Sequence, residues 1–186
     1  MPTVVVPFRA SGKSRLPADL REPLGRAMLA DVVAAALGLG RVIVVTDDAA
    51  APPSEVELVA DPARGQGAAV AAGLARASGH ALVVNADLPC ATEEALRRLA
   101  DAGPALVAAA DGTTNALSLP DPSAFAPVYG AGSAARFAAL GLVPVRIAEL
   151  EHDVDVLDDL YSLTLPLGPR TALVTDRHKD AGARSR

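Results

Sequence analysis

The segment Thr3-Val-Val-Val-Pro-Phe-Arg-Ala-Ser-Gly-Lys-Ser-Arg15 is an apolar run that leads directly into a polar, positively charged stretch. Its consecutive valines are typical of a β-strand that is covered on both faces. Lys13 is the only lysine among the first 178 residues, and Arg9 and Arg15 lie close to it in the sequence. Because α/β proteins bind phosphate groups just beyond the carboxyl ends of strands, this segment predicts the anion-binding part of a nucleotide or phosphoester enzyme.

Short apolar runs alternate with longer amphipathic or alanine-rich stretches along the chain. The predicted strands are Thr3–Val6, Arg41–Val45, Val56–Val59, Ala81–Asn85, Ala105–Ala109, Asn115–Leu119 and Val143–Ile147. The predicted helices are Pro23–Leu37, Gly67–Ala77, Thr92–Ala100, Ser133–Leu140 and Val156–Leu163, with Thr92 as an N-cap. This order predicts an α/β fold with a mainly parallel central sheet of about seven strands flanked by helices, and ligands at the carboxyl ends of the strands.

The composition fits one domain of residues 1–169, followed by a C-terminal tail of residues 170–186. The chain has 186 residues, of which 51% are hydrophobic and only 3% aromatic, so its core must be built from Ala, Val and Leu. The tail is polar and ends in Ala-Gly-Ala-Arg-Ser-Arg, which predicts a helix that frays into a partly disordered end.

Charge and cysteine content disfavour several classes of function. A net charge of -5 argues against nucleic-acid binding, which needs a basic face. The single cysteine, Cys90, cannot form an intrachain disulfide and fits a reducing compartment. No apolar run reaches the roughly 18 to 20 residues that span a bilayer. We therefore expect a cytoplasmic protein that binds neither nucleic acid nor membranes and that could form a homodimer.

Asp87 follows the predicted strand Ala81–Asn85 and precedes Leu88-Pro89. A carboxylate at the end of a strand, in a loop stiffened by proline, can hold a divalent cation at the edge of the sheet. The same residue could instead cap a turn before the next helix. Its position alone favours neither interpretation.

Asp153 and Asp155 form an Asp-x-Asp pair just before the predicted helix Val156–Leu163. Alternation along an extended segment places both side chains on one side, so one or both could complete a metal site with Asp87. N-capping of the helix is the simpler interpretation, because a carboxylate there accepts hydrogen bonds from free N–H groups.

Two glycine-containing segments at the start of predicted helices are further candidates for ligand binding. In Phe125-Ala-Pro-Val-Tyr-Gly-Ala-Gly-Ser133 the glycines let the backbone approach a ligand, and Ser133 begins a helix whose free N–H groups favour a phosphate or carboxylate as much as a plain cap. Arg64-Gly-Gln-Gly67 offers a second place for a phosphate or a base edge. For the connecting segment Asp111-Gly-Thr-Thr-Asn115, an ordinary turn is the simpler interpretation.

Gly12-Lys13-Ser14 has the form of the end of a P-loop. The glycine that a P-loop requires five residues before Gly12 is Pro7, and Pro17 follows closely, so a Walker-type kinase is excluded. The dispersed histidines and the lone cysteine form no Ser-His-Asp set, Cys-His pair or zinc spacing.

Together these segments resemble the phosphoenolpyruvate / 2-phospho-L-lactate guanylyltransferases of deazaflavin coenzyme biosynthesis. The resemblance extends from about Val4 to Thr171 and rests on Val5-Val-Pro-Phe-Arg9, Gly12-Lys-Ser-Arg-Leu16, Ala86-Asp-Leu-Pro89, Gly112-Thr-Thr-Asn-Ala-Leu117, Phe125-x-Pro-x-Tyr-Gly-x-Gly-Ser133 and Asp153-Val-Asp155. Many nucleotidyltransferases share the Asp-Leu-Pro and Asp-x-Asp pieces. The Thr-Asn-Ala-Leu strand followed by Tyr-Gly-x-Gly-Ser is more specific.

The resemblance implies a GT-A-like, Rossmann-type nucleotidyltransferase that transfers GMP from GTP to the phosphate of phosphoenolpyruvate or 2-phospho-L-lactate and releases pyrophosphate. It implies a magnesium cofactor held by Asp87 and Asp155, with Asp153 as a helper. The residues implied to bind the three-carbon phospho-acid are Thr114, Gly130 and Ser133. Those implied to neutralise the triphosphate are Lys13, Arg9 and Arg15, and we expect the nucleotide to contact Gly12, Ser14, Arg64 and Gly65.

Two positions depart from the pattern of this family. The usual Gly-Leu-Asn is Gly65-Gln66-Gly67 here, and Val156 replaces a threonine. The alternative functions are another nucleotidyltransferase of this fold, such as a molybdenum-cofactor guanylyltransferase or a cytidylyltransferase, and a non-catalytic nucleotide-binding domain. The first alternative would usually begin with a Gly-Gly loop rather than Pro7-Phe8-Arg9. The second would be favoured if Asp87 and Asp155 did not converge.

Overall fold

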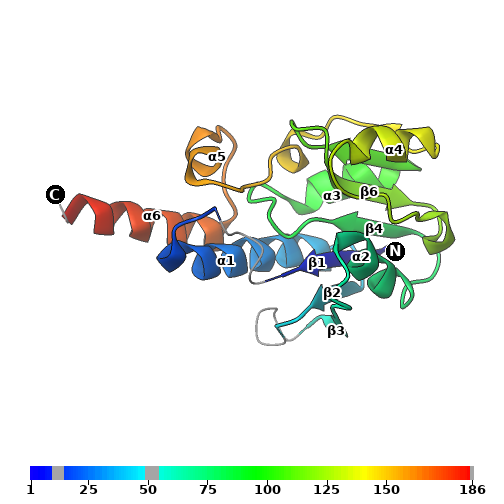
Figure 1. Ribbon diagram of the computed structural model, residues 1–186, viewed down its shortest axis with the longest axis horizontal. Helices are drawn as coiled ribbons and strands as arrows, with labels where there is room; N and C mark the ends of the chain where they lie inside the picture. The colour runs from blue at the N-terminus through cyan, green and yellow to red at the C-terminus, as the bar shows by residue number, and fades with distance from the viewer. Residues whose placement is uncertain (10–14, 49–54, 185–186) are drawn as a thin grey trace.

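A computed structural model describes residues 1–9, 15–48 and 55–184 of the chain (Figure 1). At its centre is a seven-stranded sheet with the order β3-β2-β1-β4-β6-β5-β7. Its strands are β1 (Thr3–Phe8), β2 (Val42–Thr46), β3 (Glu57–Ala60), β4 (Ala81–Val84), β5 (Ala105–Ala108), β6 (Thr114–Leu119) and β7 (Val143–Pro144). Strand β6 is antiparallel to β4 and β5, and the other neighbours pair in parallel. The prediction of a mainly parallel sheet of about seven strands is confirmed.

Helices cover both faces of this sheet. They are α1 (Ala18–Leu37), α2 (Gln66–Leu74), α3 (Glu93–Asp101), α4 (Ser133–Ala139), α5 (Leu157–Ser162) and α6 (Pro169–Arg184), with short 3-10 helices η1 (Pro122–Ala124) and η2 (Ala148–Leu150). Thr92 caps α3 as predicted, because its hydroxyl accepts a hydrogen bond of 3.1 Å from the Ala95 N–H. Among the described residues, no helix combines the length and the apolar character that crossing a membrane requires.

The valines of β1 show why its sequence is a continuous apolar run. Val4 and Val6 pack into the core layer formed with α1 and α3, whereas Val5 packs into the layer formed with α2 and α4. All three side chains are fully buried, because successive residues of a strand point to opposite faces. Gly73 brings α2 close to this strand, since a Cβ there would lie 2.5 Å from Val5 Cγ1.

The predicted boundaries were wrong by three residues or more at the start of α1, at the end of α2, which is Leu74 rather than Ala77, and at the end of β7. Helix α1 begins at Ala18 rather than Pro23, because its first turns bury Leu20 and Leu24 in a separate core cluster together with Val154. Strand β7 ends at Pro144 rather than Ile147. The last hydrogen bond between this segment and β5 runs from the Val145 N–H to the Leu106 carbonyl (2.9 Å), and the chain then turns into η2.

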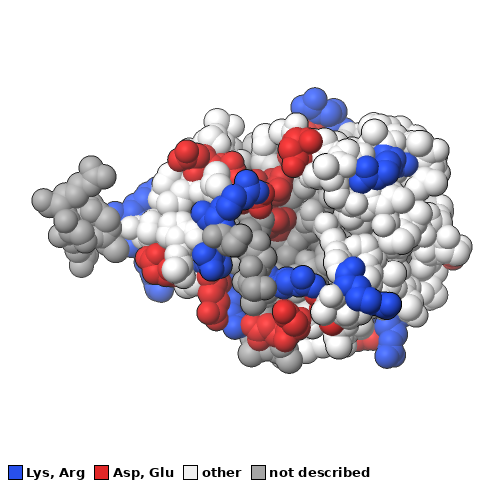
Figure 2. Space-filling view, in the orientation of Figure 1, with Lys and Arg blue, Asp and Glu red and all other residues white. Residues whose placement is uncertain are grey.

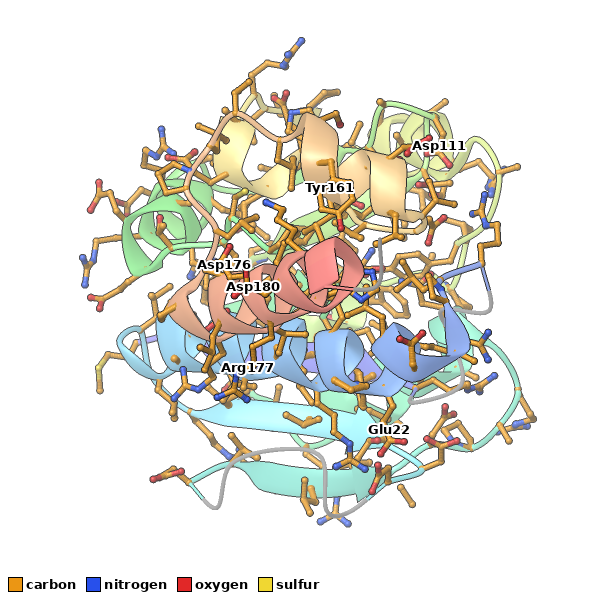
Figure 3. All side chains as sticks on the ribbon, turned by 90° about the vertical axis from the view of Figure 1, so that its left-hand side faces the viewer. Glu22, Asp111, Tyr161, Asp176, Arg177 and Asp180 are labelled. Atoms are coloured by element: carbon orange, nitrogen blue, oxygen red, sulfur yellow. The ribbon has the colours of Figure 1, made fainter. Side chains whose placement is uncertain are left out.

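Helix α6 lies along α1, and Figure 3 shows it end-on between α1 and α5. The buried carboxylate of Asp31, on α1, accepts hydrogen bonds from the N–H groups of Arg170 (3.2 Å) and Thr171 (2.8 Å) and from the Thr171 hydroxyl (2.8 Å). A side chain of one helix thus caps the start of another. Lys179 of α6 also lies over the ring of Tyr161 of α5, 5.3 Å from its centroid.

Candidate active site

A cavity of about 400 Å³ lies at the carboxyl ends of β1 and β4, beside the first residue of β6. Because β6 is antiparallel to β4, its amino end meets the carboxyl end of β4, and Thr114 therefore shares this edge with Asn85 and Asp87. Figure 2 shows acidic side chains reaching into a hollow on this face, with basic side chains at its rim. The cavity is where the α/β architecture predicts a ligand.

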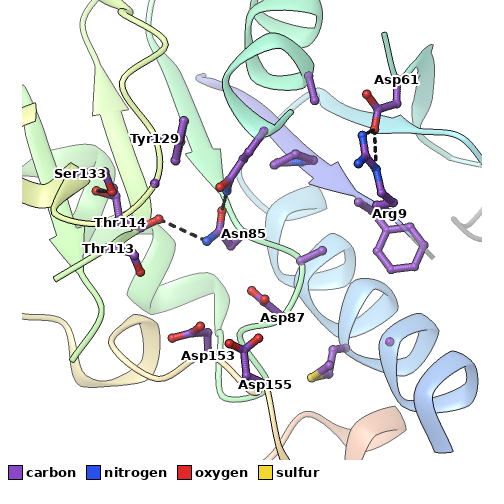
Figure 4. A pocket seen from close by; sticks show the side chains of 18 of the residues that line it. Arg9, Asp61, Asn85, Asp87, Thr113, Thr114, Tyr129, Ser133, Asp153 and Asp155 are labelled. Atoms are coloured by element: carbon purple, nitrogen blue, oxygen red, sulfur yellow. Dashed lines mark hydrogen bonds and ion pairs between the residues drawn. The ribbon is translucent and has the colours of Figure 1, made fainter. Parts of the chain in front are cut away.

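Three carboxylates converge in this cavity (Figure 4). Oxygen atoms of Asp87, Asp153 and Asp155 all lie within 4.8 Å of one another. Val154, between the two later aspartates, is fully buried and points into the core, so its neighbours on either side point into the cavity. A hydrogen bond of 3.2 Å from the Val154 N–H to the Asp87 carbonyl joins the two loops.

The helix-capping interpretation of the Asp-x-Asp pair is not supported by the geometry. Helix α5 is capped by Asp159, whose carboxylate accepts hydrogen bonds of 2.8 Å from the N–H groups of Asp155 and Val156. The side chains of Asp153 and Asp155 face the cavity instead.

The acidic cluster suits a small divalent cation. Carboxylate oxygens are the ligands that Mg²⁺ prefers, and in an octahedral site with bonds of about 2.1 Å they lie roughly 3 to 4 Å apart. The observed spacing of up to 4.8 Å is close to this range. The donor set therefore fits a site for a divalent metal ion.

Asn115 is absent from the predicted site residues, yet it holds one side of the acidic cluster. It lies fully inside β6, and its Nδ2 donates to the Leu150 carbonyl (3.1 Å) and lies 3.5 Å from Asp153 Oδ1. The sequence signal that could have indicated this role is an asparagine within an otherwise apolar strand. Its amide ties the loop that carries Asp153 to the sheet.

Two of the three cations predicted to neutralise the triphosphate, Arg9 and Arg15, form ion pairs with carboxylates in the structure. Arg15 pairs with Asp155 of the acidic cluster. Arg9 donates to Asp61 Oδ2 from Nη2 (2.8 Å) and Nε (3.2 Å), and this hydrogen bond and charge raise the pKa of the Arg9 guanidinium. Lys13, together with Gly12 and Ser14, lies outside the described residues.

The residues predicted to bind the phospho-acid come together on the opposite wall of the cavity. The hydroxyls of Thr114 and Ser133, both buried, are 3.0 Å apart. Gly130 also lines the cavity, and its φ of 105° lies in the region that favours glycine. This wall therefore offers a ligand two hydroxyl groups and a stretch of backbone that the ligand can approach closely.

Arg136 fixes the conformation of the loop 128–132, which forms part of this wall. It is absent from the predicted site residues. Its guanidinium donates to the carbonyls of Val128 (3.0 Å), Tyr129 (3.2 Å) and Ala131 (2.8 Å). An arginine one turn after Ser133, in a helix of small residues, was the only sign of this role in the sequence.

The two predicted nucleotide residues just before α2, Arg64 and Gly65, line a neighbouring groove and not the main cavity. Gln66, which is absent from the predicted site residues, lines both that groove and the main cavity. Gly67 packs tightly against the segment after η1, since a Cβ there would lie 2.9 Å from Pro127 Cβ. Of the two residues at which this segment departs from the family pattern, Gln66 faces the main cavity and Gly67 does not.

Comparisons with known proteins agree with this geometry. A family model for the MobA-like NTP transferase domain matches residues 16–144. The chain is 40% identical to a phosphoenolpyruvate guanylyltransferase of Streptomyces coelicolor, over 97% of this chain and 98% of the relative. It is 34% identical to a 2-phospho-L-lactate guanylyltransferase of Methanoregula boonei, over 87% of this chain and 81% of the relative.

Solved structures share the fold. The 2-C-methyl-D-erythritol 4-phosphate cytidylyltransferase of Thermus thermophilus superposes with a TM-score of 0.61 at 18% identity, covering 94% of this chain and 100% of that chain. A nucleotidyl transferase of Methanothermobacter gives a TM-score of 0.59 at 19% identity, covering 87% and 94%. These likenesses confirm the predicted α/β nucleotidyltransferase fold.

Proposed function

The chain belongs to the MobA-like NTP transferases and, within them, to the phosphoenolpyruvate / 2-phospho-L-lactate guanylyltransferases, and we propose that it transfers GMP from GTP to phosphoenolpyruvate. The observation that carries this proposal is the convergence of Asp87, Asp153 and Asp155 opposite the Thr114–Ser133 hydroxyl pair. One cavity thus holds a place for a cation and a place for a small anion. We propose that the reaction serves deazaflavin coenzyme biosynthesis.

We assign the acidic cluster to Mg²⁺, which when bound would neutralise charge on the triphosphate and polarise the α-phosphate. Asp87 and Asp155 would be its main ligands and Asp153 a helper. Asn115 would act only by fixing the loop that carries Asp153. Because Asp87 and Asp155 converge, the condition that would have favoured a non-catalytic nucleotide-binding domain is not met.

The Thr114 and Ser133 hydroxyls and the backbone at Gly130 would hold the phospho-acid. Hydroxyls and backbone N–H groups are neutral donors that bind a phosphate or carboxylate without adding charge. The Arg136 guanidinium keeps the loop 128–132 in the shape that this contact needs. Arg136 is therefore a positioning residue for the substrate.

The transfer joins a phosphate oxygen of the phospho-acid to the α-phosphorus of GTP and breaks the bond to the β-phosphate oxygen, so that pyrophosphate leaves. Both reacting groups are anionic, and the repulsion between them is the main barrier. The positive charges of Lys13 and Arg15 would screen this repulsion. For this, Arg15 would break its ion pair with Asp155 and contact the triphosphate. No general base is needed, because the attacking phosphate is already ionised at neutral pH.

The proposal is tested by measuring pyrophosphate release with GTP, ATP, CTP or UTP combined with phosphoenolpyruvate or 2-phospho-L-lactate, with and without Mg²⁺. We expect GTP with phosphoenolpyruvate to be turned over fastest, and only when Mg²⁺ is present. Fastest release with CTP, or release that does not depend on a phospho-acid, would contradict the proposal.

A further inference from the structure

The loop that carries Asp87 is held by backbone hydrogen bonds from two distant parts of the chain. On one side, the Val154 N–H donates to the Asp87 carbonyl (3.2 Å). On the other side, the Gly168 N–H donates to the carbonyl of Pro89, two residues after Asp87 (2.7 Å). The first hydrogen bond comes from the Asp-x-Asp loop, whereas the second comes from the residue just before α6. The C-terminal part of the chain therefore contacts a loop of the acidic cluster.

The same two segments also pack together through side chains. Leu88 and Cys90, on either side of Pro89, are buried, and Cys90 Sγ donates a weak hydrogen bond to the Leu165 carbonyl (3.8 Å). Within the loop, the Ala91 N–H donates to the Leu88 carbonyl (3.1 Å) and closes a turn. With its neighbours buried and its carbonyl bonded, Pro89 cannot move without the segment that precedes α6.

Gly168 is also the residue at which this segment meets Asp31 of α1. A Cβ at position 168 would lie 2.4 Å from Asp31 Oδ2 and 2.5 Å from its Cγ, too close for any side chain. The φ of Gly168 is not among the positive values of other glycines in the chain. The position therefore requires glycine for space, and not for backbone freedom.

The carboxylate of Asp31 cannot easily move away from Gly168. Its side chain is only 3% exposed, and its two oxygens accept the hydrogen bonds from Arg170 and Thr171 that cap α6. A shift that made room for a side chain at 168 would break these bonds inside the protein, where water cannot replace them. Asp31 thus fixes Gly168, and Gly168 fixes Pro89. Figure 1 shows α6 lying along α1, the arrangement that this contact anchors.

We infer that Asp31 and Gly168 are positioning residues for Asp87, so that the start of α6 supports the acidic cluster as well as the fold. The inference rests on the proposed function only for the assignment of a divalent cation to this cluster. A site is spoiled when a ligand moves by about 0.5 Å, and loss of a group that holds a ligand typically lowers metal affinity by about 10- to 100-fold. Neither residue would touch the ion.

The test is the dissociation constant of Mn²⁺, measured by titration calorimetry without nucleotide or phospho-acid. Gly168→Ala adds one methyl group and leaves every carboxylate of the cluster unchanged, and we expect it to bind Mn²⁺ roughly tenfold more weakly than the wild type. Asp31→Asn keeps the shape of the side chain but turns one acceptor into a donor, so its affinity should fall in the same direction.

The matched control is Leu74→Ala. Leu74 is buried at the end of α2, in the core layer that does not contain Leu88. The cavity left by this substitution should lower the thermal unfolding midpoint, but the Mn²⁺ constant should stay that of the wild type. Circular dichroism and the unfolding midpoint of each variant establish that the titrations are made on folded protein. If Gly168→Ala does not fold, Asp31→Asn decides by the same criterion.

Wild-type Mn²⁺ affinity in the folded junction variants would overturn the inference. An equal weakening in Leu74→Ala would also overturn it, because affinity would then follow overall stability. So would a wild type that binds no Mn²⁺. Because the titration contains no substrate, Mn²⁺ affinity that depends on Gly168 in a protein that releases no pyrophosphate would support this inference and refute the proposed reaction. Pyrophosphate release with equal Mn²⁺ affinity in all variants would do the reverse.

Discussion

The guanidinium of Arg15 pairs with the carboxylate of Asp155, so a cation predicted to face the triphosphate covers one of the acidic groups predicted to hold the metal. Both side chains are well exposed, at 67% and 40%. An ion pair of this exposure contributes only about 0 to 1 kcal/mol, and it can open at little cost when substrates arrive.

Arg15→Ala should therefore bind Mn²⁺ or Mg²⁺ about two- to fivefold more tightly in the absence of substrates, since 1 kcal/mol corresponds to about a fivefold change. Its turnover should fall by about tenfold, because the triphosphate loses a screening charge. Calorimetric metal titration and a pyrophosphate assay measure the two effects. Arg97→Ala removes a similarly exposed pair on α3 and should change neither. Unchanged metal affinity in Arg15→Ala would show that the pair does not compete with the ion.

Asp87→Asn should reduce Mg²⁺-dependent pyrophosphate release by roughly 100-fold or more, because an amide is a poorer ligand than a carboxylate for a hard cation. The side chains are nearly isosteric, so circular dichroism and the unfolding midpoint should stay close to the wild type. Asp158→Asn, on the exposed side of α5, is the matched control and should keep full activity. Near-normal turnover of Asp87→Asn would refute its role as a ligand.

The fold could be predicted from the sequence because its signals are local. The continuous apolar run of β1 and the hydroxyl of Thr92 each indicate structure within a few residues of themselves. The aspartates of the cluster could be predicted too, since Asp87 lies at the end of β4 and the buried Val154 sets the alternation of its neighbours. The boundary error at the start of α1 arose where packing with distant residues, such as Val154, outweighed the local pattern.

The supporting residues could not be predicted, because their roles depend on partners far along the chain. Asp31 lies 139 and 140 residues from the N–H groups that it caps, and Asn115 lies 35 residues from the carbonyl that it holds. Gln66 was noted as a departure from the family pattern, but its side-chain hydrogen bond is with Asn85, 19 residues away. Only the folded topology brings these pairs together.

Asp31→Ala should lower the free energy of unfolding by about 2 to 3 kcal/mol, because it removes a buried acceptor from two N–H groups and a hydroxyl at the start of α6. Urea denaturation followed by circular dichroism measures this change. Asp19→Ala, at an exposed position of the same helix, should change it by less than about 0.5 kcal/mol. A similar decrease in the free energy of unfolding in both variants would mean that the hydrogen bonds of Asp31 with the start of α6 contribute no stability of their own.

Burial, followed by the charge of Glu149, raises the pKa of the Cys90 thiol from 9.0 to about 11. As pH rises past 9, the unfolded chain releases this proton before the folded one does, so stability should fall progressively up to about pH 11. Urea midpoints measured across this range should decline more steeply for the wild type than for Cys90→Ala. The native thiol should also resist iodoacetamide until the chain unfolds. Rapid alkylation of the folded protein would contradict its burial.

Arg136→Ala should raise the KM for the phospho-acid by roughly tenfold or more while changing the KM for GTP little, because three carbonyls of the loop 128–132 lose their donor and the Thr114–Ser133 wall loses its shape. Arg136→Lys should restore only part of the effect, since an ammonium lacks the planar fork that reaches separate carbonyls. Arg76→Ala, an exposed arginine just after α2, is the control and should leave both constants unchanged. Steady-state kinetics with each substrate varied in turn separates the two constants. An equal rise in both KM values would show that the loop 128–132 supports the whole cavity rather than the phospho-acid site alone. Full rescue by Arg136→Lys would show that the loop requires a positive charge and not the planar guanidinium.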